Sequence, residues 1–484
     1  ALDYYKQAAD FFDSSDYQSS NYQAQKGKLF CYLLQKNEEA FQKELPKVLK
    51  LFNENRSKIL EEQNRNSFFD IEQNVYDIVI NYEFNKMNFA DAFDYAEESR
   101  SRSLLDLQNS VIQVSKDKNQ PEIEFSANLT QPLKLKEIQA EMPAETELLV
   151  YSVLSDQVLI WAITKDGLDA VKSAISSENL QEKIVNYLEL VSKQSTSDEH
   201  LKLSAELYQI LISPIKDKLD KNKQIFIIPD KSLFRLPFIT LYSDKYLVEE
   251  YKVSYSPSAN VFLNSSRKAK GFGDKKSETI LSIGNPTFNQ SEYENNLSVL
   301  PSAKEEAEEI SLKYEKRNVL TETSATKEKV EEGLKTADVV HFAGHYLVDE
   351  KIPLRSSLVL AGDKKEESNL ANSEIISKKL SNLRLIVLSA CDTGIEKYYK
   401  GEGLIGASRT FLAANVPLVV ASQWAVDSAA TKELMIRFHQ LRKNENLSTL
   451  EALRQTQVEL LKSEKFKQPY YWAAFDVFGG YTQF

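Results

Sequence analysis

The chain has 484 residues, of which 42% are hydrophobic and 10% aromatic; this is enough for several domains with buried cores and excludes a disordered or fibrous protein. Its 60 basic and 71 acidic residues give a formal charge of −11, which disfavours a broad nucleic-acid-binding surface and adhesion to an anionic membrane. Only two cysteines, no apolar run of the roughly 20 residues that cross a bilayer and no signal-peptide pattern predict a cytoplasmic protein in a reducing compartment.

Residues 1–112 show a helical pattern. "ALDYYKQAADFF" and "FADAFDYAEESRSRSLLDL" place alanine and aromatic side chains three and four positions apart, as packed helices require. We interpret the region as degenerate tetratricopeptide-like hairpins. The two Ala-Phe pairs at 40–41 and 92–93 are spaced more widely than the tetratricopeptide period of about 34 residues, so an irregular helical bundle is the alternative.

Residues 113–130 are predicted to be a linker, because "SKDKNQPEIEFSANLTQP" interrupts the helical pattern. A first α/β region follows over residues 131–272. In it, "ELLVYSVLSDQVLIWAITKDG" predicts two strands, a long helical stretch follows to about Lys221, and "KQIFIIPD" predicts another strand. The charged segment "SSRKAKGFGDKKSE" is predicted to be a mobile surface segment.

Residues 273–484 alternate between apolar strands and amphipathic helices. This alternation indicates a largely parallel sheet with helices on both faces, and in such sheets the reactive groups lie beyond the carboxyl ends of the strands. The predicted strands are "TILSIGNP", "VVHFA", "SSLVLAG", "LRLIVLSA" and "PLVVASQWAV", and the helices include "AKEEAEEISLKYE", "TKEKVEEGLKTA", "GLIGASRTFLAA" and "SAATKELMIRFHQL".

Two reactive side chains follow two of these strands, His345 and Cys391. An imidazole and a thiol at one sheet edge can form a general base and a nucleophile, in which histidine withdraws the thiol proton and the thiolate attacks a carbonyl carbon. Gly344 would let a backbone N–H approach the developing oxyanion. The histidine precedes the cysteine by roughly the 50 residues of the caspase-type order. Taken singly, Cys391 could be a small buried hydrophobe and His345 a turn residue.

A metal site is the other chemical interpretation, because His341 and His345 form an H-x-x-x-H pair. That spacing binds zinc on a helix, whereas His341 lies in a predicted strand and is better explained as a structural histidine. The remaining histidines, His200 and His439, lie on predicted helices distant from this pair. No metal or other cofactor is expected, and neither a P-loop nor a Rossmann glycine motif occurs.

Three segments, in order, resemble the CHAT family of caspase-like cysteine peptidases, which are related to caspases, separases and gingipains. They are "VVHFAGHYLVDEKIPLRSSLVLAG", "LIVLSACDTG" and "GEGLIGASRTFLAANVPLVVASQWAVDSAATKELM". The resemblance extends over about residues 130–484. It implies a caspase-like α/β domain with a pseudo-caspase-like half (131–272) and a catalytic half (273–484), preceded by an all-α, helical-repeat-like region. It makes His345 the base and Cys391 the nucleophile.

The resemblance also suggests further site residues. Relatives often have glycine directly after the histidine, where this chain has Tyr346; the backbone N–H groups of Gly344, Tyr346 and Cys391 are therefore the candidate oxyanion donors. Separases and gingipains cleave after basic residues, and Asp392 and Asp427 are the acids that could line such an S1 pocket. Asp427 would equally suit the N-cap of the next helix, and Asp392 a turn.

We therefore expect a cysteine endopeptidase with a protein substrate and a possible activating partner bound through residues 1–112. The polar segments "IEKYYKGEG" and "GDKKEESNLANSE" are long enough to reorder when such a site is completed, although a plain solvated surface is the simpler explanation. The alternative function is a non-catalytic interaction scaffold whose helical repeats bind proteins. Direct membrane contact is not expected, and broad nucleic-acid contact is disfavoured.

Overall fold

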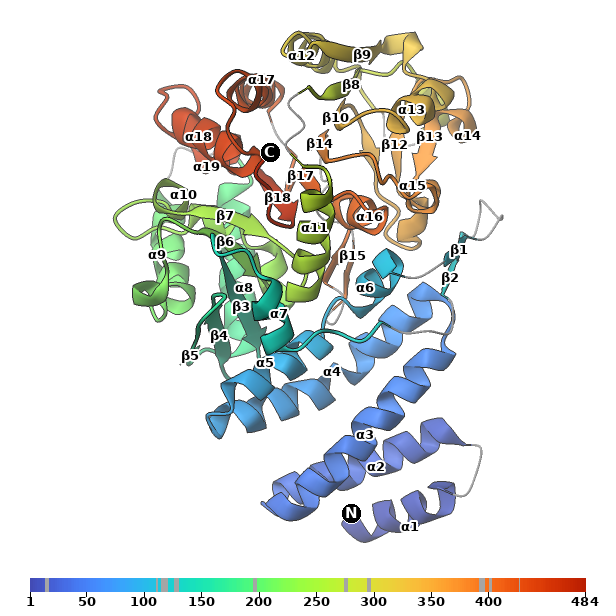
Figure 1. The fold of residues 1–484 in the computed structure, drawn as a ribbon, viewed down its shortest axis with the longest axis vertical. Helices are drawn as coiled ribbons and strands as arrows, with labels where there is room; N and C mark the ends of the chain where they lie inside the picture. Colours follow the sequence, from blue (N-terminus) through green and yellow to red (C-terminus); the bar gives the residue numbers. More distant parts are fainter. Residues whose placement is uncertain are drawn as a thin grey trace.

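A computed structural model provides the fold of the chain (Figure 1). The residues that it describes are 1–13, 17–109, 112–114, 121–125, 130–194, 198–273, 277–293, 297–390, 397–399, 403–425 and 427–484. Cys391 and Asp392 lie outside them. Across this part of the chain, no helix combines the length and the apolar character needed to span a bilayer.

The first part of the chain consists of helices that pack against their sequence neighbours, α1 on α2, α2 on α3 and α4 on α5. Two hairpin turns have the same form: Lys36 and Met87 have φ of 55° and 65°, and each is followed by an asparagine, Asn37 or Asn88. The predicted helical-repeat-like region is thereby confirmed. The helices are α1 (Leu2–Asp13), α2 (Gln18–Leu34), α3 (Glu38–Lys58), α4 (Glu62–Asn85), α5 (Phe89–Glu98) and α6 (Arg102–Asn109).

Within the predicted linker the structure has a short antiparallel pair of strands, β1 (Ile112–Val114) and β2 (Ile123–Phe125). Ile123 is buried in the same core cluster as α6 and the second α/β half. The Ile123 side chain therefore anchors this segment to the rest of the molecule. The sequence predicted a linker because the surrounding residues are rich in Lys, Asp and Asn.

The α/β part is organised around one sheet of eleven described strands in the order β5-β4-β3-β6-β7-β18-β17-β14-β10-β8-β9. Most neighbours are parallel, but β18 is antiparallel to β17 and parallel to β7, so the parallel strands of the two halves run in opposite directions. The bounds are β3 (Thr146–Val153), β4 (Val158–Ile163), β5 (Leu168–Ser173), β6 (Gln224–Ile228), β7 (Lys252–Tyr255), β8 (Thr279–Gly284), β9 (Lys316–Thr321), β10 (Val339–Ala343), β14 (Leu385–Ser389), β17 (Leu418–Ser422) and β18 (Phe475–Gly479).

Helices cover both faces of the second half of the sheet, as the sequence predicted. Val339 and Val387 pack with the residues of α12 and α17, whereas Val340 and Leu388 pack with α13, α15 and α16. The remaining helices are α7 (Leu135–Glu141), α8 (Ser177–Val191), α9 (Glu199–Leu211), α10 (Leu247–Glu250), α11 (Ala259–Gly271), α12 (Pro301–Ser311), α13 (Lys327–Leu334), α14 (Lys365–Ser368), α15 (Asn372–Lys378), α16 (Ala407–Ala413), α17 (Ser428–Asn444), α18 (Thr449–Leu461) and α19 (Pro469–Trp472).

Several strands differ from the predictions. β5 and β9 are edge strands with partly exposed polar residues, and therefore lack the apolar run that marks a central strand. The predicted strand "SSLVLAG" contains β12 (Ser357–Val359), which belongs to a separate antiparallel sheet with β11 (Tyr346–Leu347) and β13 (Asn369–Ala371). The first part of the predicted mobile surface segment, 265–278, is the end of α11, where Ser265 and Ser266 are buried.

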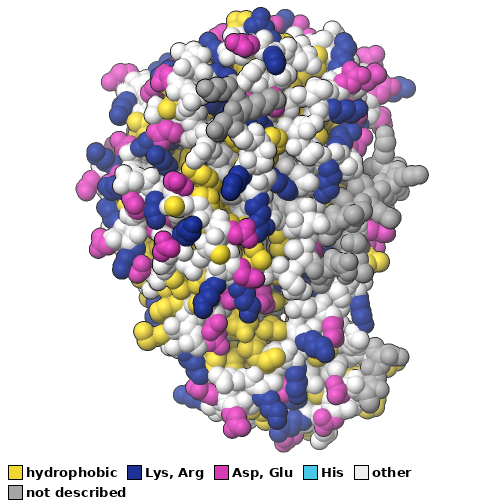
Figure 2. Space-filling view, in the orientation of Figure 1, with side chains coloured by type: hydrophobic (Ala, Val, Ile, Leu, Met, Phe, Trp, Pro, Cys, Tyr) yellow, Lys and Arg dark blue, Asp and Glu magenta, His cyan; other side chains and the backbone are white. Residues whose placement is uncertain are grey.

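A short hairpin connects the end of β14 to α16. Its strands are β15 (Lys397–Tyr399) and β16 (Gly403–Ile405), where the sequence predicted a polar segment, explained most simply as solvated surface, and the start of a helix. β15 contacts α4, so the segment that follows Cys391 in sequence reaches the helical region. Figure 2 shows acidic and basic side chains interspersed over most of one face of the molecule, with hydrophobic ones gathered in its lower half.

One buried carboxyl group lies in the strand that joins the two halves. Asp476 of β18 is 2% exposed, and the Gln423 side-chain amide donates a hydrogen bond to it. Burial raises the pKa of Asp476 well above its usual range, and the bond from Gln423 only partly opposes this rise. The pKa of Asp476 is therefore higher in the folded chain than in the unfolded chain, so the stability that this group contributes falls as pH rises above about 4.

We expect Asp476→Asn to stabilise the protein at pH 7, because asparagine keeps the shape of the protonated acid and removes the cost of protonation. The contribution of Asp476 to the free energy of unfolding falls as pH rises from about 4 towards the raised pKa of this group. The fall is about 1.4 kcal/mol per pH unit. The gain should therefore be about 1–2 kcal/mol or more at pH 7 and near zero at pH 4, measured by urea denaturation. A variant that is less stable at pH 7 would show that Asp476 is ionised.

Candidate active site

The candidate site lies beyond the carboxyl ends of two adjacent strands. β10 and β14 are parallel neighbours whose last paired positions are Ala343 and Ser389. His345 follows its paired position by two residues, and Cys391 follows Ser389 by two residues in sequence. Neighbouring parallel strands lie about 4.8 Å apart. In this register the segments that leave β10 and β14 therefore start side by side at the same edge of the sheet. The position of Cys391 itself is outside the described residues.

His345 is held in one orientation by the segment that precedes α12. Its Nε2 lies 2.7 Å from the backbone oxygen of Ser298, and its ring meets Phe288 edge-on with centroids 5.7 Å apart. A carbonyl oxygen can only accept, so Nε2 carries the hydrogen and the lone pair of the neutral imidazole lies on Nδ1. Nδ1 is therefore the nitrogen that can accept a proton.

Gly344 has a packing role that is separate from any oxyanion role. A Cβ at this position would lie 2.8 Å from the ring of Phe342, closer than real Cβ atoms approach. The next residue, Tyr346, begins β11, and its hydroxyl contacts the Asn372 side chain at 2.9 Å. The structure thus explains the residue types at 344 and 346 by packing, and the assignment of their N–H groups as oxyanion donors stays a prediction.

The chain end of β14 is fixed from the neighbouring strand. The hydroxyl of Ser422, at the end of β17, donates a hydrogen bond of 2.6 Å to the backbone oxygen of Ala390. Ala390 is buried and directly precedes Cys391. The residue before the predicted nucleophile is thereby tied to the sheet.

Of the two acids predicted to bind a basic substrate, only Asp427 is described. It is the N-cap of α17, and its Oδ1 accepts from the N–H groups of Ala429 and Ala430 at 3.0 and 2.9 Å. Both bonds use Oδ1. The helix-capping role that the sequence offered as an alternative is therefore present, and a substrate role for Asp427 or Asp392 stays a prediction.

His341 is a buried structural histidine with partners that the sequence did not reveal. Its Nε2 lies 2.8 Å from a Glu306 oxygen, and its Nδ1 lies 3.3 Å from Nε2 of His439. The expectation that His439 is distant was wrong, because α17 crosses the face of β10 that carries His341. Burial and the neighbouring His341 lower the pKa of His439 well below its usual range. No cluster of three metal-ligating side chains occurs among the described residues.

The sequence missed the groups that contact His345 and His341. For His345, Ser298 acts through its backbone oxygen, which any residue supplies, and Phe288 lies in a segment far from it along the chain. For His341, the partner is Glu306, which lies on a different element. Glu306 was detectable only as an acid on the face of a predicted helix that packs on the sheet.

The geometry defines a caspase-like α/β fold, in which a histidine follows one central strand and a cysteine follows the next, with a helical-repeat-like region in front. The sequence model of the CHAT domain matches residues 201–480, more than half of the chain. The chain belongs to the CHAT family.

Known proteins share parts of this architecture. Tetratricopeptide repeat protein 28 of Homo sapiens is 26% identical over 324 residues, which cover 56% of this chain and 13% of that protein; the Mus musculus protein is 25% identical over the same length. The separase of the Saccharomyces cerevisiae separase–securin complex has a TM-score of 0.60 at 10% identity, covering 96% of this chain and 40% of that one. The chain therefore spans only a minor part of the length of these relatives, and the separase likeness shows the fold alone.

Proposed function

We propose that the protein is a cysteine endopeptidase in which His345 is the general base and Cys391 the nucleophile. The observation that carries the proposal is the parallel register of β10 and β14, in which Ala343 pairs with Ser389 and each reactive residue follows two positions later. The caspase-like fold and the oriented imidazole of His345 support it. The CHAT family membership is consistent with a peptidase.

The proposed reaction begins with transfer of the Cys391 thiol proton to Nδ1 of His345. The thiolate attacks the carbonyl carbon of the scissile peptide bond, and the negative charge that forms on its oxygen is stabilised by backbone N–H groups, for which Gly344, Tyr346 and Cys391 are the candidates. His345 then gives the proton to the leaving amine as the C–N bond breaks. A water molecule, deprotonated by His345, hydrolyses the thioester and restores both groups.

We further propose a preference for a basic residue before the scissile bond, with Asp392 and Asp427 as the acidic partners. For Asp427, both helix-capping bonds use Oδ1, which leaves Oδ2 to meet a substrate cation. The side chain would then serve two purposes with its two oxygens. Asp427→Asn retains the cap and removes the charge, so it separates the two roles.

The helical region is proposed to receive a partner or substrate. The supporting observation is the contact between β15 and α4, because it connects the segment after Cys391 to the helices. The related separase is found in a complex with securin, another protein. A partner bound to residues 1–112 would thus bind a region that contacts β15, the strand that follows Cys391 in sequence.

The test combines labelling with a cleavage assay. At neutral pH, iodoacetamide is expected to modify Cys391 faster than Cys31, which lies half-buried on α2, because an activated thiol is largely thiolate. His345→Ala should slow labelling of Cys391 and leave Cys31 unchanged, as measured by peptide mass spectrometry. Peptides containing Arg or Lys should be cleaved, and cleavage should be lost in Cys391→Ala.

Equal, slow labelling of the two cysteines would argue against the peptidase and favour the interaction scaffold. Cleavage that persists in Cys391→Ala would assign the activity to another group or a contaminant. Candidate partner proteins are added to both assays. Labelling or cleavage that increases on their addition would show that the site needs an activator, and no increase would indicate an inactive site.

A further inference from the structure

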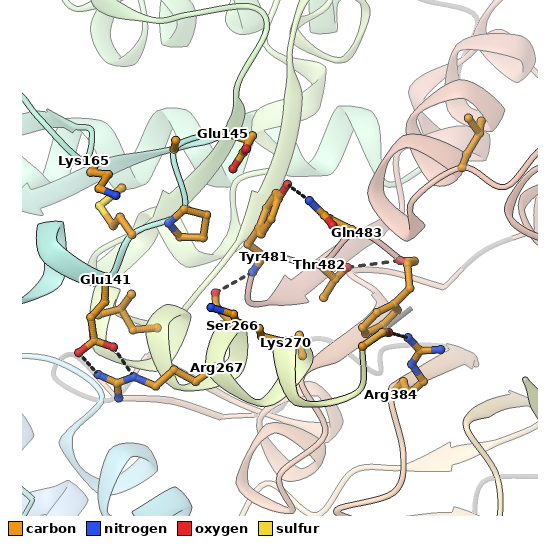
Figure 3. Close-up of a pocket in the computed structure, with 18 of the residues that line it drawn as sticks. Glu141, Glu145, Lys165, Ser266, Arg267, Lys270, Arg384, Tyr481, Thr482 and Gln483 are labelled. Carbon is orange, nitrogen blue, oxygen red and sulfur yellow. Dashed lines mark hydrogen bonds and ion pairs between the residues drawn. The ribbon is translucent and has the colours of Figure 1, made fainter. Parts of the chain in front are cut away.

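A cavity of about 1010 Å³ lies away from the candidate active site (Figure 3). It is bounded by the end of α7, the second half of α11, the end of α17 and the residues that follow β18. Two of its lining residues, Glu278 and Arg384, directly precede β8 and β14. The cavity therefore reaches the amino ends of the strands, whereas His345 follows the carboxyl end of β10.

The cavity concentrates positive charge in an acidic protein. Its described lining contains six basic side chains and three acidic ones, whereas the whole chain has a formal charge of −11. The basic residues are Lys165, Arg267, Lys270, Arg384, Arg442 and Lys443, and the acidic ones are Glu141, Glu145 and Glu278. A locally positive cavity attracts anions.

The floor of the cavity is a buried cluster in which three cations share one carboxylate. Glu278 accepts from Arg442 at 2.6 and 2.8 Å, from Arg384 at 3.2 Å and from Lys443 at 3.3 Å. The guanidinium of Arg384 also lies 4.0 Å from the ring centre of Phe484. Arg384 is fully buried and Arg442 is 5% exposed, so this charge is held in a low-dielectric environment.

The rim of the cavity carries exposed basic groups. Arg267 pairs with Glu141 through two bonds of 2.6 Å, and Lys165 and Lys270 have no side-chain partner within the described ranges. Figure 3 shows Lys165, from the turn after β4, to the upper left of Tyr481, and Lys270, from α11, below it. Two ammonium groups that come from different elements of the rim suit a ligand with separated anionic groups.

A chain of buried hydrogen bonds leads from the cavity floor to β10. Arg442 can only donate, so the Tyr314 hydroxyl accepts from it at 3.2 Å and gives its own hydrogen to Nδ1 of His439 at 2.9 Å. Nε2 of His439 then donates to His341 at 3.3 Å, and Nε2 of His341 donates to Glu306 at 2.8 Å. The two ends of the chain, a guanidinium and a carboxylate, fix one direction for every bond.

The far end of this hydrogen-bond chain lies on α12, the helix that follows the segment that orients His345. Glu306 is on α12, and Ser298, whose oxygen holds Nε2 of His345, shortly precedes α12. His341 is on the strand that leads to His345. A change at Arg442 is therefore connected to both the strand and the segment that position the imidazole.

We propose that this cavity is an effector site for a small molecule bearing several phosphate or carboxylate groups, and that its occupancy is transmitted along the chain from Arg442 to Glu306. Anionic groups of the ligand compete with Glu278 for the floor cations and bind Lys165 and Lys270 at the rim, while Tyr481 provides an aromatic contact surface. A ligand that changes the contacts of Arg442 shifts the hydrogen bonds that run from Arg442 to Glu306 and, through them, β10.

Binding is tested by isothermal titration calorimetry with pyrophosphate, citrate and ATP as probes, at constant ionic strength. Lys165→Glu combined with Lys270→Glu should weaken binding by about tenfold or more, because both rim charges are reversed. Lys335→Glu, the same change at an exposed lysine outside the cavity lining, should leave binding unchanged. Binding of pyrophosphate and ATP but not citrate would identify phosphate as the anionic group, and the reverse would identify carboxylate. Absence of binding for all three probes, or equal binding to the double variant, would overturn the proposal.

Transmission is tested by NMR of the imidazole groups, of which the chain has only four. Saturating probe should shift the signals of His341 and His439, while His200, which contacts Tyr246 in the first half, should stay unchanged. Tyr314→Phe removes the hydroxyl that connects Arg442 to His439. This variant should still bind the probe, but the signal of His341 should no longer shift. Signals of His341 and His439 that do not move at saturation would refute transmission. The measurements are repeated in Cys391→Ala, so their outcome is independent of peptidase activity.

Discussion

Replacing Cys391 with alanine is expected to reduce the hydrolysis rate of a cleavable peptide by about 10³-fold or more. The substitution removes the sulfur that would form the covalent intermediate of the proposed reaction. Initial rates with a fluorogenic peptide, at substrate concentrations below KM, measure the effect.

Two controls make this result specific. Cys31→Ala removes the only other thiol, which lies on α2 in the helical region, and should leave the rate within about twofold. His345→Ala should lower the rate about as far as Cys391→Ala, and the double variant should be no worse than either, because the two groups act as a unit. Additive losses would contradict a shared catalytic step.

The strands of the second half could be predicted because both faces of the sheet are covered. Val339 and Val387 face α12 and α17, and Val340 and Leu388 face the helices on the other side. Most positions in β10 and β14 are therefore apolar, with His341 and Ser389 as the exceptions. β18 was missed, although it joins the halves, because its sequence contains Asp476 and follows a tight turn. A buried strand that carries an acidic residue lacks the continuous apolar pattern by which the other central strands could be predicted.

The candidate site was predictable to the extent that topology fixes it. Residues that follow neighbouring parallel strands meet at one edge, and this is why His345 could be selected from four histidines. The partners of these residues could not be predicted, because they depend on how helices cross the sheet. His439 comes next to His341 only because α17 packs over β10, and Ser298 contributes a backbone oxygen that carries no sequence signal.

A buried ion cluster ties together the helices of the N-terminal region. Oδ2 of Asp106 on α6 accepts from Arg56 of α3 at 2.8 Å and from Arg65 of α4 at 3.3 Å, and its Oδ1 accepts from the N–H of Thr130 at 2.9 Å. Asp106, Arg56 and Arg65 are all fully buried. One carboxylate thus balances two guanidinium groups from two other helices.

Asp106→Ala is expected to lower the free energy of unfolding by about 3–5 kcal/mol, because it leaves both buried guanidinium groups without their shared counter-charge. Urea denaturation followed by circular dichroism measures the change. Asp106→Asn keeps an acceptor for Thr130 but replaces Oδ2 with an NH2 donor that faces the two guanidinium groups, so it should also be destabilised while the bond to Thr130 is retained. Asp166→Ala, in the exposed turn after β4, should stay within about 0.5 kcal/mol of the parent. If Asp106→Ala also stays within that range, the arginines find other compensation and the cluster does not hold α3, α4 and α6 together.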